Sequence, residues 1–327
     1  MTITQLHYVL AVAEFRNFTK AAEKVFVTQP TLSMQVQKFE EELGVKVFDR
    51  TKKPIHLTEV GQKIVTQAKN IVNESIRIND IIDQQKGFIG GEFKLGIIPT
   101  VMPTLLPMFL NNFINKYPKV KLRIEEYHTQ EIIDHLRDGT LDAAIAATPL
   151  EEDDILEQTL YYEPFVGYIP KHHSLQNKKS LQKDDISADD VLLLEDGHCF
   201  KNNVLNLCQS DLSITESKFN LESGSFETLM KLSDEGLGMT LLPYLHSLNI
   251  EGEAKSNIKP FEKPQPAREV SLIYHKSELK IHIIDALKEL VLSIVKGAIE
   301  FEDVEIISPI EKEKQKNQTD IAFEQLR

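Results

Sequence analysis

The chain contains two cysteines, Cys199 and Cys208, which stand nine positions apart in a sequence of 327 residues. A thiolate can attack an oxidant and become a sulfenic acid, which a second thiol can capture as a disulfide. Two cysteines are too few for a disulfide framework, so a bond between them would be conditional. In an arbitrary chain, both would more often be small buried hydrophobic residues. The pair therefore indicates either redox chemistry or ordinary packing.

The residues around Cys199 predict the surroundings of its thiol. Asp196-Gly197 is typical of a turn, and residues 200–207 have the composition of a short helix. Cys199 is therefore expected at or near a helix N-terminus, where the partial positive charge favours the thiolate. His198 and Lys201 would add to this effect, and Glu195 and Asp196 would oppose it. The sign of the net effect stays open.

The spacing of the two thiols sets a geometric condition. If residues 200–207 are helical, nine steps of about 1.5 Å separate the two Cα atoms by roughly 13.5 Å. A disulfide needs Cα atoms about 4.4–6.8 Å apart. Bridging Cys199 and Cys208 must then disrupt the intervening segment, and oxidation becomes a conformational change. If the segment is extended and the thiols already adjacent, no such coupling follows.

Near the N-terminus, two helical patterns, Thr19–Val25 and Pro30–Phe39, follow each other and predict a helix-turn-helix. Thr28 can cap the second helix, and Pro30 is tolerated in its first turn. Small alanines allow close helix crossing, and apolar residues recur at helical spacing as a buried stripe. The residues left facing outward are Thr31, Ser33, Gln35 and Lys38.

A basic segment and a long helix come next. Arg50–Leu57 resembles a hairpin or wing that would lie against phosphate. A helix is expected from Thr58, and its apolar positions alternate four and three apart, as in a coiled-coil seam that contributes to a dimer interface. Glycines 87, 90 and 91 then mark a hinge. The seam positions are Leu57, Gly61, Ile64, Ala68, Ile71, Ser75, Ile78 and Ile82.

Beyond the hinge, short apolar strands alternate with helical stretches, which predicts parallel α/β sheets, two small sheets with a cleft between them. A helix over Leu279–Ile299 and a loose charged tail over 311–317 would close the chain. The expected strands are Phe93–Ile98, Val120–Ile124, Asp142–Ala147, Phe165–Ile169, Val191–Leu194, Phe219–Leu221, Met239–Leu242 and Val270–Tyr274.

The charge distribution separates the two parts of the chain. The net charge is −13, but residues 1–60 hold eight basic and seven acidic side chains, so the head carries +1 and the rest −14. A near-neutral head on an acidic body is typical of a head that docks on DNA. No apolar run is long enough to span a bilayer, so no membrane contact is expected and the chain is predicted to be cytoplasmic.

Two motifs in the head, Ala21–Ser33 and Leu43–Arg50, resemble the signature of LysR-type transcription regulators. The similarity continues through Leu57–Gly61, Gly139–Ile145 and Gly236–Pro243 and covers roughly residues 1–300. It implies an all-α winged helix-turn-helix domain plus linker helix, followed by an α/β regulatory region of two subdomains like a periplasmic binding protein. It also implies homodimers and homotetramers on double-stranded DNA at a promoter operator, and contact with RNA polymerase.

On this resemblance, domain boundaries can be assigned. The expected domains are a DNA-binding domain at 1–58, a linker helix at 59–87, a regulatory domain at 88–300 and a loose tail at 301–327. Within the regulatory domain, one subdomain is expected at 88–162 with 267–300 and the other at 163–266.

The resemblance also implies DNA-contacting residues. The N-terminal turn of a recognition helix enters the major groove, so the candidates for base edges are Gln29, Pro30, Thr31 and Ser33. Arg50 and Lys53 are better placed for phosphate. Without the resemblance, an ordinary three-helix bundle with solvated polar residues would explain the pattern equally well, and Lys38 and Lys46 remain open between surface charge and DNA contact.

Within the family, Glu195–Cys199 with Cys208 resembles the peroxide-sensing members. The resemblance implies that hydrogen peroxide oxidises Cys199 to a sulfenic acid, that Cys208 resolves it as a disulfide, and that the change switches transcription of antioxidant genes. It further implies a peroxide site built with His198, Thr100, Thr129 and Arg268. The family pattern has an Arg-Asp pair shortly after the reactive cysteine, where this chain has Lys201-Asn202, so a salt bridge through that acid is in doubt.

Simpler roles compete for the same residues. Thr100 and Thr129 each precede an expected helix and would serve equally as N-caps. Arg268 would serve equally in a surface or inter-subdomain ion pair.

Other functions compete as well. A LysR-type regulator with a small anion in the cleft near Thr100 and Thr129, and structural cysteines, is the main alternative. A thiol peroxidase is disfavoured because no peroxidase motif accompanies the DNA-binding head. No metal site is expected from the cysteine and histidine spacing, and no phosphate-binding or dinucleotide glycine motif indicates a cofactor.

Overall fold

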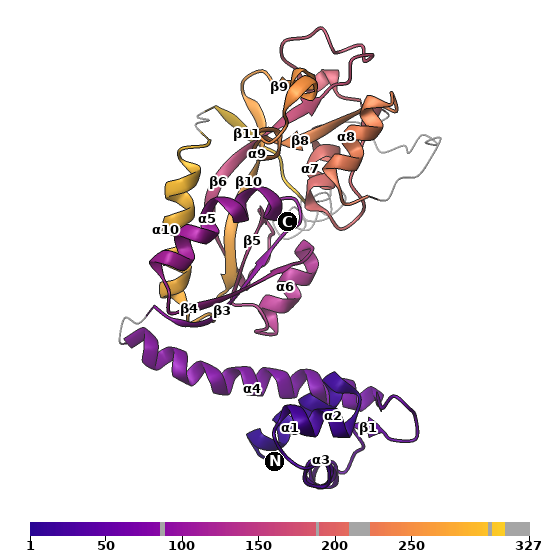
Figure 1. Cartoon of the computed structure of the whole chain (residues 1–327), viewed down its shortest axis with the longest axis vertical. Coiled ribbons are helices and arrows are strands. Elements are labelled where there is room, and N and C mark those ends of the chain that lie inside the picture. The colour runs from indigo at the N-terminus through magenta and orange to yellow at the C-terminus, as the bar shows by residue number, and fades with distance from the viewer. Residues whose placement is uncertain (86–88, 188–189, 209–222, 300–302, 311–327) are drawn as a thin grey trace, which may run out of the picture. The chain divides into compact units, whose positions relative to one another are not determined.

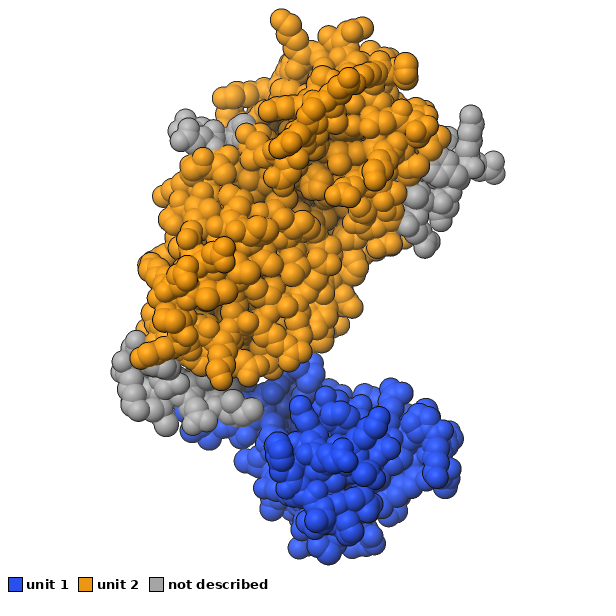
Figure 2. Space-filling model, viewed as in Figure 1, with its two compact units in different colours: residues 1–88, 137–140 blue, residues 89–136, 141–327 orange. Residues whose placement is uncertain are grey.

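A computed structural model describes the chain except for residues 86–88, 188–189, 209–222, 300–302 and 311–327 (Figure 1). Its contacts divide the chain into two compact units (Figure 2). The first holds residues 1–88 and 137–140, and the second holds residues 89–136 and 141–327. The expected strand at 219–221 and the charged run at 311–317 lie outside the described residues.

The first unit begins with three helices, α1 (Ile3–Phe15), α2 (Phe18–Lys24) and α3 (Gln29–Leu43). The structure confirms the helix-turn-helix, and Thr28 caps α3 by accepting a bond of 3.4 Å from the backbone N–H of Thr31. Helix α1 was not predicted, although Thr2 and Gln5 form a capping box at its start. Of the outward residues, Ser33 and Gln35 are half-buried, and Gln35 accepts a hydrogen bond from the side chain of Gln5 at 3.4 Å.

The predicted wing is a short hairpin in which β1 (Phe48–Asp49) pairs antiparallel with β2 (His56–Leu57). The carboxylate of Glu40, with a 0% exposed side chain, holds the start of the wing. It accepts from the backbone N–H groups of Val47 at 2.8 Å and Phe48 at 3.1 Å, and from Arg50 at 3.0 Å. A buried carboxylate is stable here because three donors replace its water.

Helix α4 (Glu59–Gln85) forms the expected long helix, and the hydroxyl of Thr58 accepts from the N–H of Gly61 at its start. Ala68 and Val72 are buried in the hydrophobic core of the first unit, together with residues of α1. Part of the predicted seam therefore packs inside the chain. Because such packing needs the same apolar positions that a dimer would use, periodicity could not distinguish the two.

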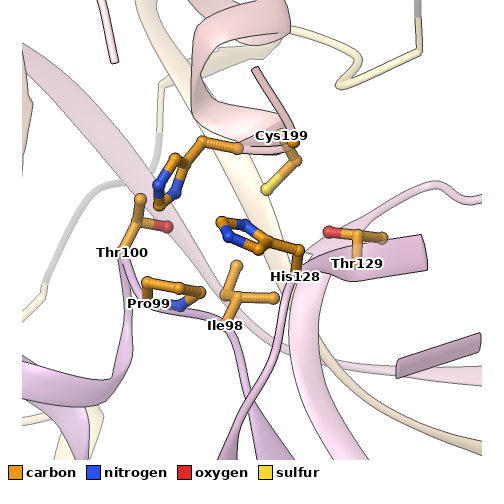
Figure 3. Close-up of a pocket in the computed structure, with 8 residues that line it drawn as sticks. Ile98, Pro99, Thr100, His128, Thr129 and Cys199 are labelled. Atoms are coloured by element: carbon orange, nitrogen blue, oxygen red, sulfur yellow. The ribbon is translucent and has the colours of Figure 1, made fainter. Parts of the chain in front are cut away.

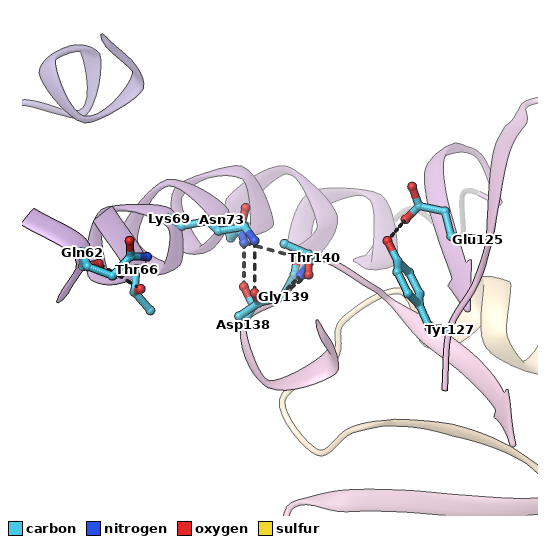
Figure 4. A network of polar contacts seen from close by, with 9 residues as sticks. All are labelled: Gln62, Thr66, Lys69, Asn73, Glu125, Tyr127, Asp138, Gly139 and Thr140. Carbon is cyan, nitrogen blue, oxygen red and sulfur yellow. Dashed lines mark hydrogen bonds and ion pairs between the residues drawn. The ribbon is translucent and has the colours of Figure 1, made fainter. Parts of the chain in front are cut away.

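Residues 137–140 group with α4 through polar contacts (Figure 4). The ammonium of Lys69 lies 3.0 Å from the carboxylate of Asp138, and the side-chain amide of Asn73 donates to the carbonyls of Asp138 and Gly139 at 2.8 and 3.2 Å. Gly139 has a φ of +67°, a conformation that glycine adopts without strain.

The second unit is built on a sheet of mixed direction. Strand order is β4-β3-β5-β10-β6-β8-β7, with β11 paired to β10 and β9 paired to β6. The strands are β3 (Gly91–Ile97), β4 (Val120–Glu126), β5 (Ala143–Thr148), β6 (Ile155–Tyr168), β7 (Val191–Leu192), β8 (Met239–Pro243), β9 (Ile258–Pro260), β10 (Gln265–His275) and β11 (Val304–Ile306).

The expectation of parallel sheets is confirmed for some strand pairs and wrong for others. β3 pairs parallel with β4 and β5, and β7 with β8, but β10 runs antiparallel to both β5 and β6. The long β6 pairs with β10 over Ile155–Pro164 and with β8 over Phe165–Tyr168. Strand β6 thus joins β10 to β8. Its first part, which pairs with β10, was not predicted from the sequence.

Helices cover this sheet. α5 (Met102–Lys116) packs against α10 (Ile281–Val295), and α6 (Thr129–Arg137) lies apart from both across the strands in Figure 1. One hydrophobic core lies between these helices and β3, β5 and β10, and a second surrounds β6, β8 and α7 (Cys199–Leu207). The structure also describes the α-helices α8 (Phe226–Asp234) and α9 (Tyr244–Ser247) and two short 3-10 helices, Lys183–Asp185 and Gly252–Asn257.

The expectation of a loose tail from residue 301 is wrong for the part that the structure describes. Val304–Ile306 forms β11, which pairs parallel with β10, and Ile307 is buried. The side chain of Asn203 donates to the carbonyl of Ile307 at 2.6 Å, and that of Asn206 to the carbonyls of Ser308 and Ile310 at 2.8 Å. None of the described helices is long and apolar enough to cross a membrane.

Gly61 sets a testable limit on this packing. A Cβ added there would lie 2.1 Å from the backbone carbonyl oxygen of Val47, which cannot move without the wing. We expect Gly61→Ala to destabilise the first unit by about 1–3 kcal/mol, measured as a fall in the urea midpoint of its unfolding. Gly297→Ala, whose Cβ would meet no atom closer than 3.6 Å, is the control. Equal midpoints for the two variants would contradict this account of the packing.

Candidate functional site

A narrow hollow of about 140 Å³ lies between the loops that precede α5, α6 and α7 (Figure 3). Four of the six predicted redox residues line it, namely Cys199, His198, Thr100 and Thr129. Arg268 is hydrogen-bonded to Thr100, whereas Cys208 is not among the lining residues. The complete lining is Ile98, Pro99, Thr100, His128, Thr129, Gly197, His198 and Cys199.

The two cysteines are free thiols at the two ends of one helix. Cys199 is the first residue of α7 and is buried, and Cys208 is its C-cap and half-buried. Residues 200–207 are therefore helical, and the spacing estimate of roughly 13.5 Å between the Cα atoms applies. The helix packs with Phe200, Val204 and Leu207 in the second core, so it cannot shorten without leaving that core.

The environment of Cys199 favours the protonated thiol. Burial raises the pKa of the Cys199 thiol, and the charge of Arg268 and the hydroxyl of Thr129 lower it by less. Burial also lowers the pKa of His198, so its imidazole is more readily neutral. Lys201 forms an ion pair with Asp196. The positive end of the helix thus does not decide the state of the thiol, because desolvation opposes it.

Arg268 is the largest fully buried side chain and stands on β10, at an exposed fraction of 0%. Its guanidinium donates to the carboxylate of Glu163 on β6 at 2.7 and 3.0 Å. It also donates to the hydroxyl of Thr100 at 2.8 Å and to the carbonyl of Thr100 at 3.1 Å. The surface interpretation of Arg268 is therefore wrong, because its ion pair lies in the interior.

The N-cap interpretation of the threonines is also wrong. Helix α5 begins at Met102 after Val101, without a side-chain cap, and Thr100 instead holds Arg268. Helix α6 begins at Thr129 itself. The buried hydroxyl of Thr129 points toward the side where Cys199 lies (Figure 3) and helps to lower the pKa of that thiol. Both hydroxyls are thus placed by the fold for roles other than capping.

Two residues of the site were not predicted from the sequence. Glu163 is 1% exposed and neutralises Arg268, and His128 lines the hollow beside His198 with the two rings 4.6 Å apart. Glu163 stands between apolar residues of β6. A carboxylate at such a position indicates a buried partner of opposite charge and could have been noticed in the sequence. His128 directly precedes Thr129, and only the tertiary fold brings it to residue 198.

The predicted DNA-contacting residues lie mostly on the surface. Gln29, Pro30 and Thr31 are exposed at the start of α3, and Ser33 is half-buried. Lys53 is exposed in the wing, whereas Arg50 is partly occupied by its ion pair with Glu40. Phe26, not predicted as a contact, is 95% exposed in the turn between the two helices, where its φ of +56° turns the chain.

Comparison with known proteins identifies the family to which this architecture belongs. Residues 86–294 match the family model "LysR substrate binding domain", and residues 3–62 match "Bacterial regulatory helix-turn-helix protein, lysR family". The chain belongs to the LysR family of transcription regulators. As a LysR-type regulator it is a DNA-binding protein and not an enzyme.

Among LysR-type regulators, the chain is similar to OxyR proteins. It is 33% identical to the DNA-binding transcriptional dual regulator OxyR of Escherichia coli over 277 residues, which cover 84% of this chain and 89% of that protein. A full-length OxyR variant from Pseudomonas aeruginosa has a TM-score of 0.71 and 33% identity, and the match covers 89% of this chain and 98% of that one.

A hydrogen-peroxide-bound structure is also similar. It is a cysteine-to-serine variant of OxyR from Corynebacterium glutamicum, with a TM-score of 0.61 and 28% identity, and the match covers 91% of this chain and 93% of that one.

The hydroxyl of Thr100 gives a direct test of the site's stability. Thr100→Val leaves a buried N–H of Arg268 without its acceptor, and we expect a loss of about 1–3 kcal/mol of unfolding free energy. Thr104→Val is the matched control, because among the described residues the hydroxyl of Thr104 donates to the carbonyl of Val101, the N-cap of the same helix, and not to Arg268. Urea unfolding of both variants checks this expectation, which fails if the two substitutions cost the same.

Proposed function

We propose that this LysR-type regulator senses hydrogen peroxide through Cys199 and Cys208. In response it switches the transcription of antioxidant genes and acts as an activator. The observation that carries the proposal is the placement of the Cys199 thiol in a hollow lined by Thr100, Thr129 and His198. A second thiol, Cys208, lies at the far end of the same helix. The hydrogen-peroxide-bound OxyR relative supports the choice of oxidant.

The proposed chemistry has two steps. The thiolate of Cys199 attacks one oxygen of hydrogen peroxide, the O–O bond breaks, and the departing hydroxide takes a proton to leave as water. Cys199 is then a sulfenic acid. The thiolate of Cys208 attacks this sulfur, an S–S bond forms, the S–O bond breaks, and a second water leaves after protonation. Both thiols are oxidised and one peroxide is reduced.

The groups around Cys199 have matching roles. The hydroxyl of Thr129, which lines the hollow with the thiol, can hold a peroxide oxygen, and the neutral imidazole of His198 can donate to the departing oxygen. Arg268 lowers the pKa of Cys199 against the effect of burial, and so increases the thiolate fraction. The thiolate fraction governs attack, because the thiolate is the nucleophile.

The size of the hollow favours peroxide over a metabolite. Its lining residues approach one another too closely to leave open space for a metabolite, whereas pockets for small molecules of drug size span about 300–1,000 Å³. A LysR-type regulator with a metabolite effector and structural cysteines is therefore the weaker candidate.

Disulfide formation must then take α7 apart. The second thiol cannot reach the first while residues 200–207 remain helical, because the two Cα atoms must come about 7 Å or more closer. Unwinding α7 also breaks the bonds from Asn203 and Asn206 to the segment after β11. Oxidation is thus coupled to the repacking of the second core, which we propose changes the subunit contacts of a homodimer and homotetramer.

Thiol chemistry tests this proposal. With stoichiometric hydrogen peroxide, the wild-type chain should lose two free thiols and change its DNA footprint. Cys208→Ser should lose one thiol, trapped as a sulfenic acid by a dione reagent, without forming a disulfide. Cys199→Ser should lose none at a comparable rate. Mass spectrometry and thiol titration give the counts. A peroxide-dependent footprint that persists in Cys199→Ser would refute the thiol mechanism.

We also propose how this regulator contacts a promoter operator in double-stranded DNA, with RNA polymerase as its partner in activation. The first turn of α3, with Gln29, Pro30, Thr31 and Ser33, would meet base edges in the major groove. Lys53, and Arg50 to the extent that Glu40 leaves it available, would meet phosphate.

Two substitutions separate base contact from phosphate contact. Gln29→Ala should cost about 1–3 kcal/mol of binding to the operator and relax its sequence preference. Lys53→Ala should weaken all sequences alike and reduce the slope of log affinity against log salt by about one. Lys179→Ala, an exposed lysine of the second unit, should change neither. Fluorescence anisotropy over a salt series measures both effects, and an unchanged slope for Lys53→Ala would remove that residue from the interface.

A further inference from the structure

Three potential metal ligands meet beside the hollow, and two of them, His128 and His198, line it. They are His128, from the loop before α6, with Glu195 and His198, from the loop before α7. One ligand atom from each lies within 4.8 Å of the other two. Glu195 and His198 are three positions apart, but His128 is distant in sequence, so the cysteine and histidine spacing that predicted no metal site could not indicate this group.

Three of the four imidazole nitrogens in this group have no hydrogen-bond partner among the described residues. Both ring nitrogens of His198 are buried and unpartnered, as is Nδ1 of His128. The side chain of His198 is 2% exposed, and its nearest acceptor is Oε1 of Glu195 at 3.6 Å from Nε2. The two rings pack edge to face with an interplanar angle of 83°, which gives none of these three nitrogens a hydrogen-bond partner. Buried polar nitrogens without partners are costly, and a bound ion would remove this cost.

A glycine keeps the space beside two of these ligands open. A Cβ at Gly224 would lie 3.0 Å from Oε1 of Glu195 and 3.1 Å from Nε2 of His198. A larger residue at 224 would therefore crowd the two ligand atoms that face each other.

We propose that His128, Glu195 and His198 form a binding site for a divalent transition metal of the zinc class. Two imidazole nitrogens and one carboxylate oxygen suit Zn²⁺ and similar ions rather than Mg²⁺ or Ca²⁺, which prefer oxygen ligands. Bonds of about 2.0–2.1 Å in a tetrahedral site require ligand atoms roughly 3.4 Å apart. The partly exposed side chain of Glu195, at 39%, can rotate toward the ion, and the two imidazoles must also turn to bring their nitrogens to this spacing.

The position of the site gives it a regulatory consequence, which rests on the proposed function. The metal joins the loop before α6 to the loop before α7, and His198 is adjacent to Cys199. A bound ion thus fixes the N-terminal end of α7, which must move when the disulfide forms. Bound Zn²⁺ therefore slows disulfide formation between Cys199 and Cys208.

Metal binding is tested first without thiols. Tag-free full-length protein carrying Cys199→Ser and Cys208→Ser is titrated with Zn²⁺ by calorimetry and with Co²⁺ by absorption spectroscopy. One ion per chain is expected, with d–d bands of a site with nitrogen and oxygen ligands. His128→Ala and Glu195→Gln should each weaken Zn²⁺ binding by about tenfold or more. His172→Ala, an exposed histidine elsewhere in the second unit, should leave the affinity unchanged.

Three results would overturn the site. The first is a titration in which the chain does not bind one Zn²⁺ ion. The second is a Zn²⁺ affinity of Glu195→Gln equal to that of the cysteine-free protein. The third is binding that requires the cysteines, seen as a thiolate-to-cobalt charge-transfer band that vanishes with them. Circular dichroism checks that each variant is folded. If His128→Ala does not fold, Glu195→Gln still tests the site.

The regulatory consequence has its own measurement. In the chain with both cysteines, saturating Zn²⁺ should slow peroxide-driven loss of the two thiols several-fold, and Glu195→Gln should abolish this slowing. An unchanged rate at full occupancy would refute the coupling. If peroxide consumes no thiols even without Zn²⁺, the proposed peroxide function fails, whereas the titration of the cysteine-free protein still decides the metal site.

Discussion

The buried ion pair between Arg268 and Glu163 is the interaction on which the rest of the second unit depends. It joins β10 to β6, the two long strands, and its remaining N–H groups hold Thr100 at the edge of the hollow. Removing either charge would leave the other buried without a partner, at a cost of about 3–5 kcal/mol. The same guanidinium lowers the pKa of the Cys199 thiol, so one cation serves both the architecture and the electrostatics of the site.

Helix α7 connects the chemistry to the packing of the chain. Its first residue is Cys199 in the hollow, its C-cap is Cys208, and its middle is packed in the second core. Asn203 and Asn206 bind the segment after β11, so the C-terminal end of the described chain secures this helix from outside. A reaction that brings the two ends of a packed helix together cannot be absorbed locally, because cores are bistable rather than continuously deformable. The proposed metal site would act on the same helix from its N-terminal end.

In the first unit, a buried carboxylate has an equivalent structural role. Glu40 satisfies two backbone N–H groups of the wing and takes up Arg50, so the hairpin is fixed to α3 by charge-assisted bonds. This arrangement keeps the start of α3 and the exposed Lys53 on a rigid support. It also reduces the availability of Arg50 for phosphate, which the sequence could not show, because a basic residue looks alike whether it is paired or free.

The sequence by itself determined the helix-turn-helix, the cap at Thr28, the helix between the cysteines and the family. These follow from local periodicity, capping chemistry and contiguous motifs. Only the tertiary structure decided the antiparallel course of β10 and β6, the burial of Arg268 with Glu163, and the meeting of His128 with His198. Each of these joins residues far apart in the chain, and no local preference encodes which distant partner a buried charge will find. The protonation of Cys199 belongs to the same class, because desolvation depends on everything packed around the sulfur.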